Sequence, residues 1–297
     1  MPAAATHCPS RAVPTPAGII ACLAALAALG APVAPAAAAV PDSTAALPPA
    51  TAGSAAADSL AAVTTAYAAG DLAASRAAAE AVLARHPGSY AAQWQLARVL
   101  IDLGNREPGK EAREALYARA EEHARRAVAL RPDDTWGHHY LAASVGKLAL
   151  TAGGRAKVDM SREVRDEAEE AVALDPRNDK SWHILGRWNR EMANLSPLLK
   201  LAAKVVYGGL PKGASNEKAV DCFEKAIAIA PEHVNHHLEL GKTYMEMERY
   251  DLAQAEFTTA LALPDSDPND PEYKAEAAKL LQQAKLAAAA PRRDVSR

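Results

Sequence analysis

The sequence predicts an all-α protein, a solenoid of about five antiparallel helical hairpins with two insertions and a C-terminal capping helix. The first observation is a set of five similar helix endings, closed by Pro87, Pro132, Pro176, Pro231 and Pro264. These prolines are 45, 44, 55 and 33 residues apart, and a period of roughly 34 residues with insertions is typical of stacked helical hairpins. The second observation is that apolar residues recur at helical spacing between the prolines. The third is an alanine-rich composition with 5% aromatic residues, which favours one elongated helical domain.

The first three predicted hairpins match the repeat pattern loosely. Their repeat positions are held by Tyr67, Gly70 and Val82 in the first unit, by Trp94, Ala97, Leu100, Ala124 and Ala127 in the second, and by His138, Leu141, Ala142, Ala168 and Ala171 in the third. Helical spacing places these residues on one face of each helix. The first insertion, which includes residues 153–157, lies between the two helices of the third unit.

The fourth and fifth predicted hairpins match the pattern closely. Their repeat positions are held by Trp182, Leu185, Gly186, Ala219, Phe223 and Ala226 in the fourth unit, and by Leu240, Gly241, Tyr244, Ala253, Phe257 and Ala260 in the fifth. In each unit large rings and a leucine fill the space between the helices, and the glycine lets the partner helix approach. This spacing is similar to the consensus of the tetratricopeptide repeat (TPR).

The second insertion covers residues 195–216 and interrupts the fourth hairpin. Ser196 followed by Pro197 predicts a helix start, because serine caps helices and proline suits the first turn. The apolar residues that follow predict a helix that either covers the groove from within the fold or contacts an acyl chain, a membrane surface or a partner. The residues that such a contact would use are Leu198, Leu199, Val205, Val206 and Tyr207. After Pro264, residues 271–290 predict the capping helix.

The predicted domain organisation is an export signal at residues 1–39, a flexible linker at 40–57, the repeat domain at 58–290 and a disordered tail at 291–297. Arg11 precedes an apolar run at 18–29, and small residues follow it. The run is about a dozen residues long, whereas roughly 20 cross a bilayer. We therefore expect a bacterial protein exported to the periplasm or the exterior, without a transmembrane span after signal cleavage. A retained anchor is the alternative.

Composition excludes several classes of protein. The formal net charge of −3 argues against a nucleic-acid-binding protein, which is normally basic. Cys222 is the only cysteine of the predicted repeat domain, so neither a disulfide framework nor a thiolate metal cluster is expected there. The histidines at 138–139 and 233–237 follow no metal-binding motif, and we expect no metal and no cofactor. Since no catalytic arrangement is visible, we expect the protein not to be an enzyme.

The candidate ligand site is a basic strip on the first helices of the hairpins, which line the concave face of a TPR stack. Lys180, His183, Arg187 and Arg190 fall at i, i+3, i+7 and i+10 and form one stripe. The neighbouring units add Trp136, His139 and Lys147 on one side and Asn235, Leu238 and Lys242 on the other. Basic side chains suit carboxylate or phosphate groups. The alternative is a solvated face whose charges pair with Glu191, Glu239 and Glu246.

Three runs of residues, 183–188, 192–195 and 208–211, carry a more specific resemblance. Together with Phe223 and the segment 241–244 they resemble the regulator of microtubule dynamics family, over about residues 58–285. The resemblance implies a TPR fold, and it implies that eukaryotic relatives associate with microtubules or tether organelles and that one branch binds phospholipid. We expect a non-enzymatic scaffold that binds a protein or peptide with acidic groups; the alternative is a module that binds or transfers anionic phospholipid.

Overall fold

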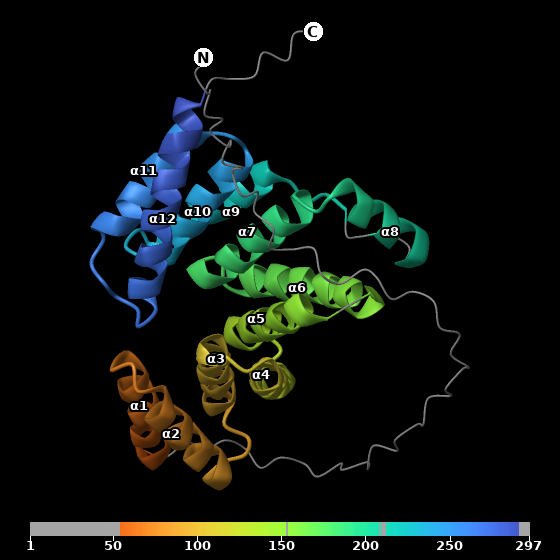
Figure 1. Ribbon diagram of the computed structural model, residues 1–297. Helices are drawn as coiled ribbons and strands as arrows, with labels where there is room; N and C mark the ends of the chain where they lie inside the picture. The colour runs from red at the N-terminus through yellow and green to blue at the C-terminus, as the bar shows by residue number, and fades with distance from the viewer. Residues whose placement is uncertain (1–53, 153, 208, 210–211, 291–297) are drawn as a thin grey trace, which may run out of the picture. The chain divides into compact units, whose positions relative to one another are not determined.

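The computed structural model describes residues 54–152, 154–207, 209 and 212–290 (Figure 1). In these ranges it contains twelve helices and no strand. The helices are α1 (Ser54–Ala68), α2 (Leu72–Arg85), α3 (Tyr90–Arg106), α4 (Lys110–Leu130), α5 (Thr135–Thr151), α6 (Gly154–Leu174), α7 (Asp179–Ala193), α8 (Pro197–Tyr207), α9 (Asn216–Ile229), α10 (Val234–Glu246), α11 (Tyr250–Ala262) and α12 (Asp270–Ala289). The predicted signal at 1–39 and tail at 291–297 lie outside the described residues. Helix α1 begins within the range predicted as linker.

The helices pair as five hairpins and a cap. Helices α1 and α2, α3 and α4, α5 and α6, α7 and α9, and α10 and α11 pack against each other, and α12 packs against α10 and α11. The first helices of successive hairpins also touch, from α1 through α3, α5, α7 and α10. The predicted all-α, TPR-like solenoid with a capping helix is therefore confirmed.

The two insertions take different forms. The residues of the first one lengthen α5 and α6 to 17 and 21 residues and leave a short connection between Thr151 and Gly154. Ion pairs along α6, from Arg155 and Arg162 to Asp159, suit a helix that extends into solvent. The second insertion contains α8, which packs against α6 and leaves Leu198 71% exposed. The expectation that this helix covers the groove from within the fold is not met, because among the described helices α8 packs against α6, a second helix of a hairpin, and touches α7 only at its last residue, through Lys200.

A repeated hydrogen bond closes the turn between hairpins. In four turns the proline carbonyl accepts from the side chain six residues later, and the donors are Gln93, His138, Trp182 and His237, at 2.9–3.1 Å from Pro87, Pro132, Pro176 and Pro231. Three of these side chains also bond to the second helix of their own hairpin, at His123, Glu167 and Glu256. We call this arrangement the proline latch. It ties the turn to both helices of the hairpin that follows.

In three hairpins a glycine lets the two helices come close to each other. A methyl group on Gly186 would lie 2.8 Å from the ring of Phe223, and one on Gly241 would lie 2.5 Å from that of Phe257. The ring of Tyr117 lies against Gly104 in the same way. Both phenylalanines are fully buried, so these rings cannot move into solvent to make room.

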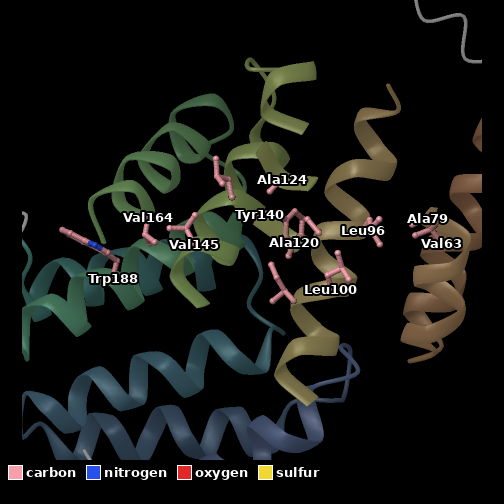
Figure 2. Packing of buried hydrophobic residues seen from close by; sticks show 13 residues of the cluster. Val63, Ala79, Leu96, Leu100, Ala120, Ala124, Tyr140, Val145, Val164 and Trp188 are labelled. Carbon is pink, nitrogen blue, oxygen red and sulfur yellow. The ribbon is translucent and has the colours of Figure 1, made fainter. Parts of the chain in front are cut away.

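The apolar core follows the stack of helices. One cluster of buried residues runs from Val63 and Ala79 on the first hairpin to Val164 and Trp188 on α6 and α7, as Figure 2 shows. A second cluster joins α9, α10, α11 and α12 around Phe223 and Phe257. Each hairpin thus buries its apolar faces against its neighbours, as in a repeat protein.

We predict that Gly241→Ala destabilises the protein by about 1–3 kcal/mol, because the added methyl group overpacks a ring that cannot shift. Gly146→Ala is the control, because its methyl group would meet Val164 at an ordinary 3.6 Å. Alanine suits a helix better than glycine, so this control should be neutral or stabilising by up to about 1 kcal/mol. Urea denaturation followed by far-UV circular dichroism measures both changes. Equal effects of the two substitutions would contradict the explanation.

Candidate functional site

The predicted basic stripe on α7 faces α10, and its members differ in accessibility. His183 and Arg190 are buried, whereas Lys180 and Arg187 are partly exposed. Helix α7 starts at a capped turn, in which Asn178 accepts from the backbone of Ser181, and this cap fixes where the stripe begins. The stripe then divides into two groups, a histidine cluster at the start of the helix and a carboxylate cluster further along.

The carboxylate cluster surrounds Glu239 of α10, whose side chain is 6% exposed. Arg190 Nη1 lies 2.6 Å from Glu239 Oε2, and Lys242 Nζ lies 2.9 Å from Oε1. Arg187 Nε approaches Oε2 to 3.8 Å. Burial raises the pKa of Glu239, but Arg187, Arg190 and Lys242 outweigh burial and hold this pKa well below its usual range. Glu239 is therefore ionised and is the shared counter-charge of Arg187, Arg190 and Lys242.

The carboxylate cluster has an excess of positive charge. Lys147 of α5 is half-buried, and its pKa is lowered to about 8, first by burial and then by the charge of Arg187. Among the described residues Lys147 has no ion-pair partner, and the side chain of Arg187 remains 41% exposed. Lys242 and Arg190 also reach Glu276 and Glu191, which lie at the exposed edge. Lys147 and Arg187 are consequently the cations least compensated by the protein.

The histidine cluster joins the start of α7 to the start of α10. His236 Nε2 lies 2.9 Å from Asp179 Oδ2, and His236 Nδ1 lies 2.9 Å from His183 Nδ1. Lys180 Nζ lies 3.2 Å from His233 Nε2. Burial, followed by neighbouring charges, lowers the pKa of His183 and His233. Burial also lowers the pKa of His236, although the hydrogen bond and the charge of Asp179 act against it. These rings are therefore neutral at pH 7.

The remaining predicted groove residues pack elsewhere. Trp136 stacks on Trp94 at a centroid distance of 5.3 Å, and His139 Nδ1 lies 3.1 Å from Ser181 Oγ. Burial, followed by the charge of Lys180, lowers the pKa of His139 to about 3. Asn235 is half-buried on α10. The structure thus gives Trp136 and His139 a packing role and does not bring them into the carboxylate cluster.

The predicted contact residues of the inserted helix lie on α8. Leu198, Leu199 and Val205 are 71%, 42% and 76% exposed. The side chains of Val206 and Tyr207 lie outside the described part of the structure. The helix is fastened at its ends by polar contacts, in which Lys200 donates to the carbonyl of Ala193 and Arg162 to that of Gly209.

A family model described as regulator of microtubule dynamics protein 1-3 matches residues 60–285. The chain belongs to this family. Among relatives, regulator of microtubule dynamics protein 1 of Bos taurus is 28% identical over 191 residues, which cover 64% of this chain and 60% of the bovine protein. The Homo sapiens protein of the same name is 27% identical over 190 residues, covering 63% of this chain and 60% of the human protein. The matched region thus spans about three fifths of the length of these relatives.

A solved structure supports the fold assignment. The chain resembles a thermophilic TPR protein of Thermus thermophilus with a TM-score of 0.57 at 21% identity, over 76% of this chain and 99% of that one. At this identity the likeness concerns the fold alone. Together with the family, it confirms the resemblance that the motifs around Trp188 and Gly209 indicated.

The family overturns the predicted localisation. The matching relatives are animal regulators of microtubule dynamics and not bacterial periplasmic proteins, so the prediction of an exported, periplasmic or extracellular bacterial protein is wrong. That prediction depended on the apolar composition of residues 18–29, and composition alone does not distinguish a secretion signal from another apolar segment. Within the described residues, none of the helices combines the length and apolarity needed to cross a membrane.

Two residues of the site were underrated by the sequence pattern. Glu239 was expected only as a neutralising partner, yet it organises the cations around it. Asp179 was not singled out, although it lies four residues before His183 and so on the same helical face. His236 and Glu239 are three residues apart on α10, and this spacing was a further signal that both side chains lie on the face of α10 that meets α7.

We predict that Glu239→Gln destabilises the fold at neutral pH by about 3–5 kcal/mol, because it leaves buried cations without their counter-charge. The folded-state pKa of Glu239 lies below its ordinary value of 4.5. Its contribution is therefore present above pH 4.5 and is lost as the pH falls below it. Urea denaturation between neutral and acidic pH measures both effects.

The matched control is Glu246→Gln on the same helix, at an exposed position, which should change stability by less than about 0.5 kcal/mol. In the Glu239→Gln variant the acid-dependent loss of stability should be smaller than in the wild type. An unchanged pH profile in that variant would refute the assigned role of the carboxylate.

Proposed function

We propose that this chain is a non-enzymatic TPR scaffold that binds a protein or peptide segment with carboxylate groups, and that Lys147 and Arg187 receive one of these groups. The TPR fold supports the general part of this proposal, since repeat arrays of this kind present extended binding surfaces. The observation that carries the specific part is the pair of cations on α5 and α7, Lys147 and Arg187, which the protein compensates least.

Arg187 has the geometry that such a contact needs. Its guanidinium is partly exposed, and among the described residues it makes one long ion pair and no hydrogen bond. A guanidinium can donate two parallel hydrogen bonds to a carboxylate, and such charge-assisted bonds are stronger than neutral ones. The free nitrogens of Arg187 are therefore suited to a ligand carboxylate.

Lys147 gives a second reason to expect a ligand carboxylate at this place. Its charge and that of Arg187 repel each other, and burial makes this repulsion more costly. A carboxylate between them would offset the repulsion and favour the charged form of the lysine. Glu239 offsets part of the charge of Arg187 and Lys147, but it is shared with Arg190 and Lys242.

Selection of a displayed library of random extended peptides against the full-length protein tests the proposal. We expect the selected peptides to be enriched in aspartate and glutamate. Arg187→Glu should weaken binding of a selected, fluorescently labelled peptide by roughly tenfold or more, because a charge-assisted hydrogen bond is replaced by repulsion. Fluorescence anisotropy measures the affinity.

The control is Lys279→Glu, which makes the same charge change at an exposed position of α12 and should leave the affinity unchanged apart from long-range effects. Selected peptides without acidic enrichment, or equal losses in both variants, would refute a specific role of Arg187. Binding to vesicles that contain anionic phospholipid, in place of the peptides, would favour the lipid alternative.

A further inference from the structure

We propose that Asp179, His233 and His236 form a binding site for one divalent transition-metal ion of the Zn²⁺ type, which joins α7 to α10. This inference is independent of the peptide contact at Arg187. It concerns the histidine cluster at the other end of the stripe. In this cluster a carboxylate of the fourth hairpin, Asp179, lies beside two histidines of the fifth hairpin, His233 and His236.

The three side chains converge from two helix starts. Asp179 is the first residue of α7, His233 is the N-cap residue of α10, and His236 follows three residues later. Residues three apart share a helical face, so both rings point toward the same part of α7. One ligand atom of each residue lies within 4.8 Å of the corresponding atoms of the other two.

The separations are close to those that a metal needs. His236 Nε2 and Asp179 Oδ2 are 2.9 Å apart, and the two imidazole rings stack with centroids 4.3 Å apart. Ligand atoms bound tetrahedrally to zinc at about 2.0–2.1 Å are separated by roughly 3.4 Å. Because the two imidazole rings are stacked, at least one of them must turn before both rings can direct a lone pair at one ion. Two imidazoles and a carboxylate leave the fourth position for water or another ligand.

A buried nitrogen without a partner points to a ligand. His233 Nδ1 is shielded from solvent and, in the described structure, has no hydrogen-bond partner. Buried polar atoms are normally paired, and an exception calls for an explanation. A metal ion bound through Nδ1 of His233 would supply one.

His183 holds one of the ligands in place. When His236 binds the ion through Nε2, its Nδ1 carries the proton, and this proton can be donated to His183 Nδ1 at 2.9 Å. Such outer partners orient metal-binding histidines and strengthen them as ligands. His183 can accept this hydrogen bond through the lone pair of its Nδ1 when its own ring proton is on Nε2.

The side chain of Lys180 disfavours binding of the metal ion. Its Nζ lies 3.2 Å from His233 Nε2, so the ammonium contacts a ring that the metal must share. It also adds a positive charge next to the site. Occupancy thus requires this side chain to turn toward solvent, which its partial exposure permits. Removal of Lys180 should accordingly strengthen binding.

Zinc titration of the full-length protein in competition with a chromophoric chelator tests the site. We expect one zinc ion to be lost, or bound at least tenfold more weakly, in Asp179→Asn and in His233→Ala. Lys180→Met should bind zinc several-fold more tightly than the wild type. His183→Gln should weaken binding by about tenfold or more if it acts as an outer partner.

Glu256→Gln is the matched control, because Glu256 also pairs with a histidine, His237, at 2.7 Å but has no second imidazole beside it. It should leave zinc affinity unchanged. The other candidate zinc ligands, His7, Cys8 and Cys22, are present in every variant, so the differences between variants report on this site. Circular dichroism verifies that each variant is folded.

A thermal melt provides a readout that does not depend on the chelator. Zinc should raise the unfolding temperature of the wild type and of Glu256→Gln, because an ion bound only by the folded state stabilises it. It should not raise that of His233→Ala. Equal zinc affinity in the wild type, Asp179→Asn and His233→Ala would overturn the proposal, as would an equal loss in Glu256→Gln.

Discussion

One buried carboxylate, that of Glu239, determines how the inner helices of the fourth and fifth hairpins meet. Arg190 and Lys242 reach it from α7 and α10, and Lys242 extends the contact to Glu276 on α12. An ionised group in such surroundings is stable only if several opposite charges accompany it. The same requirement places more cations around it than it can neutralise. The positive charge available to a ligand at Arg187 is thus a by-product of burying an acid.

Burial favours the neutral form of both kinds of titratable group in this region. It drives protons off His139, His183 and His233, but the neighbouring cations outweigh it at Glu239 and keep that carboxyl ionised. Neutral imidazole rings and permanently charged arginine side chains therefore lie along the same helix, α7, and its neighbours. The stretch of α7 between Asp179 and Arg190 can thus present lone pairs at one end and a positive charge at the other.

The repeat architecture could be predicted from the sequence because it depends on contacts within a hairpin. The pairing of Gly186 with Phe223 and of Gly241 with Phe257 follows from helical spacing and from the size of the side chains. The carboxylate cluster could not be predicted in the same way. Whether Arg190 lies in a groove or against Glu239 depends on the distance between α7 and α10, which neither helix specifies alone. The placement of α8 against α6 likewise depends on contacts outside any period.

The proline latch has a consequence for how repeats of this kind diverge. Gln93, His138, Trp182 and His237 are chemically unlike, but each offers an N–H at the same distance from a proline carbonyl. This position requires a donor of suitable reach and direction, and four different residue types meet that requirement in this chain. A profile that requires tryptophan six residues after the proline matches only the fourth hairpin, whereas one that accepts any donor there matches four turns. The second and third hairpins, which match the repeat pattern loosely by residue type, share this hydrogen bond with the fourth and fifth.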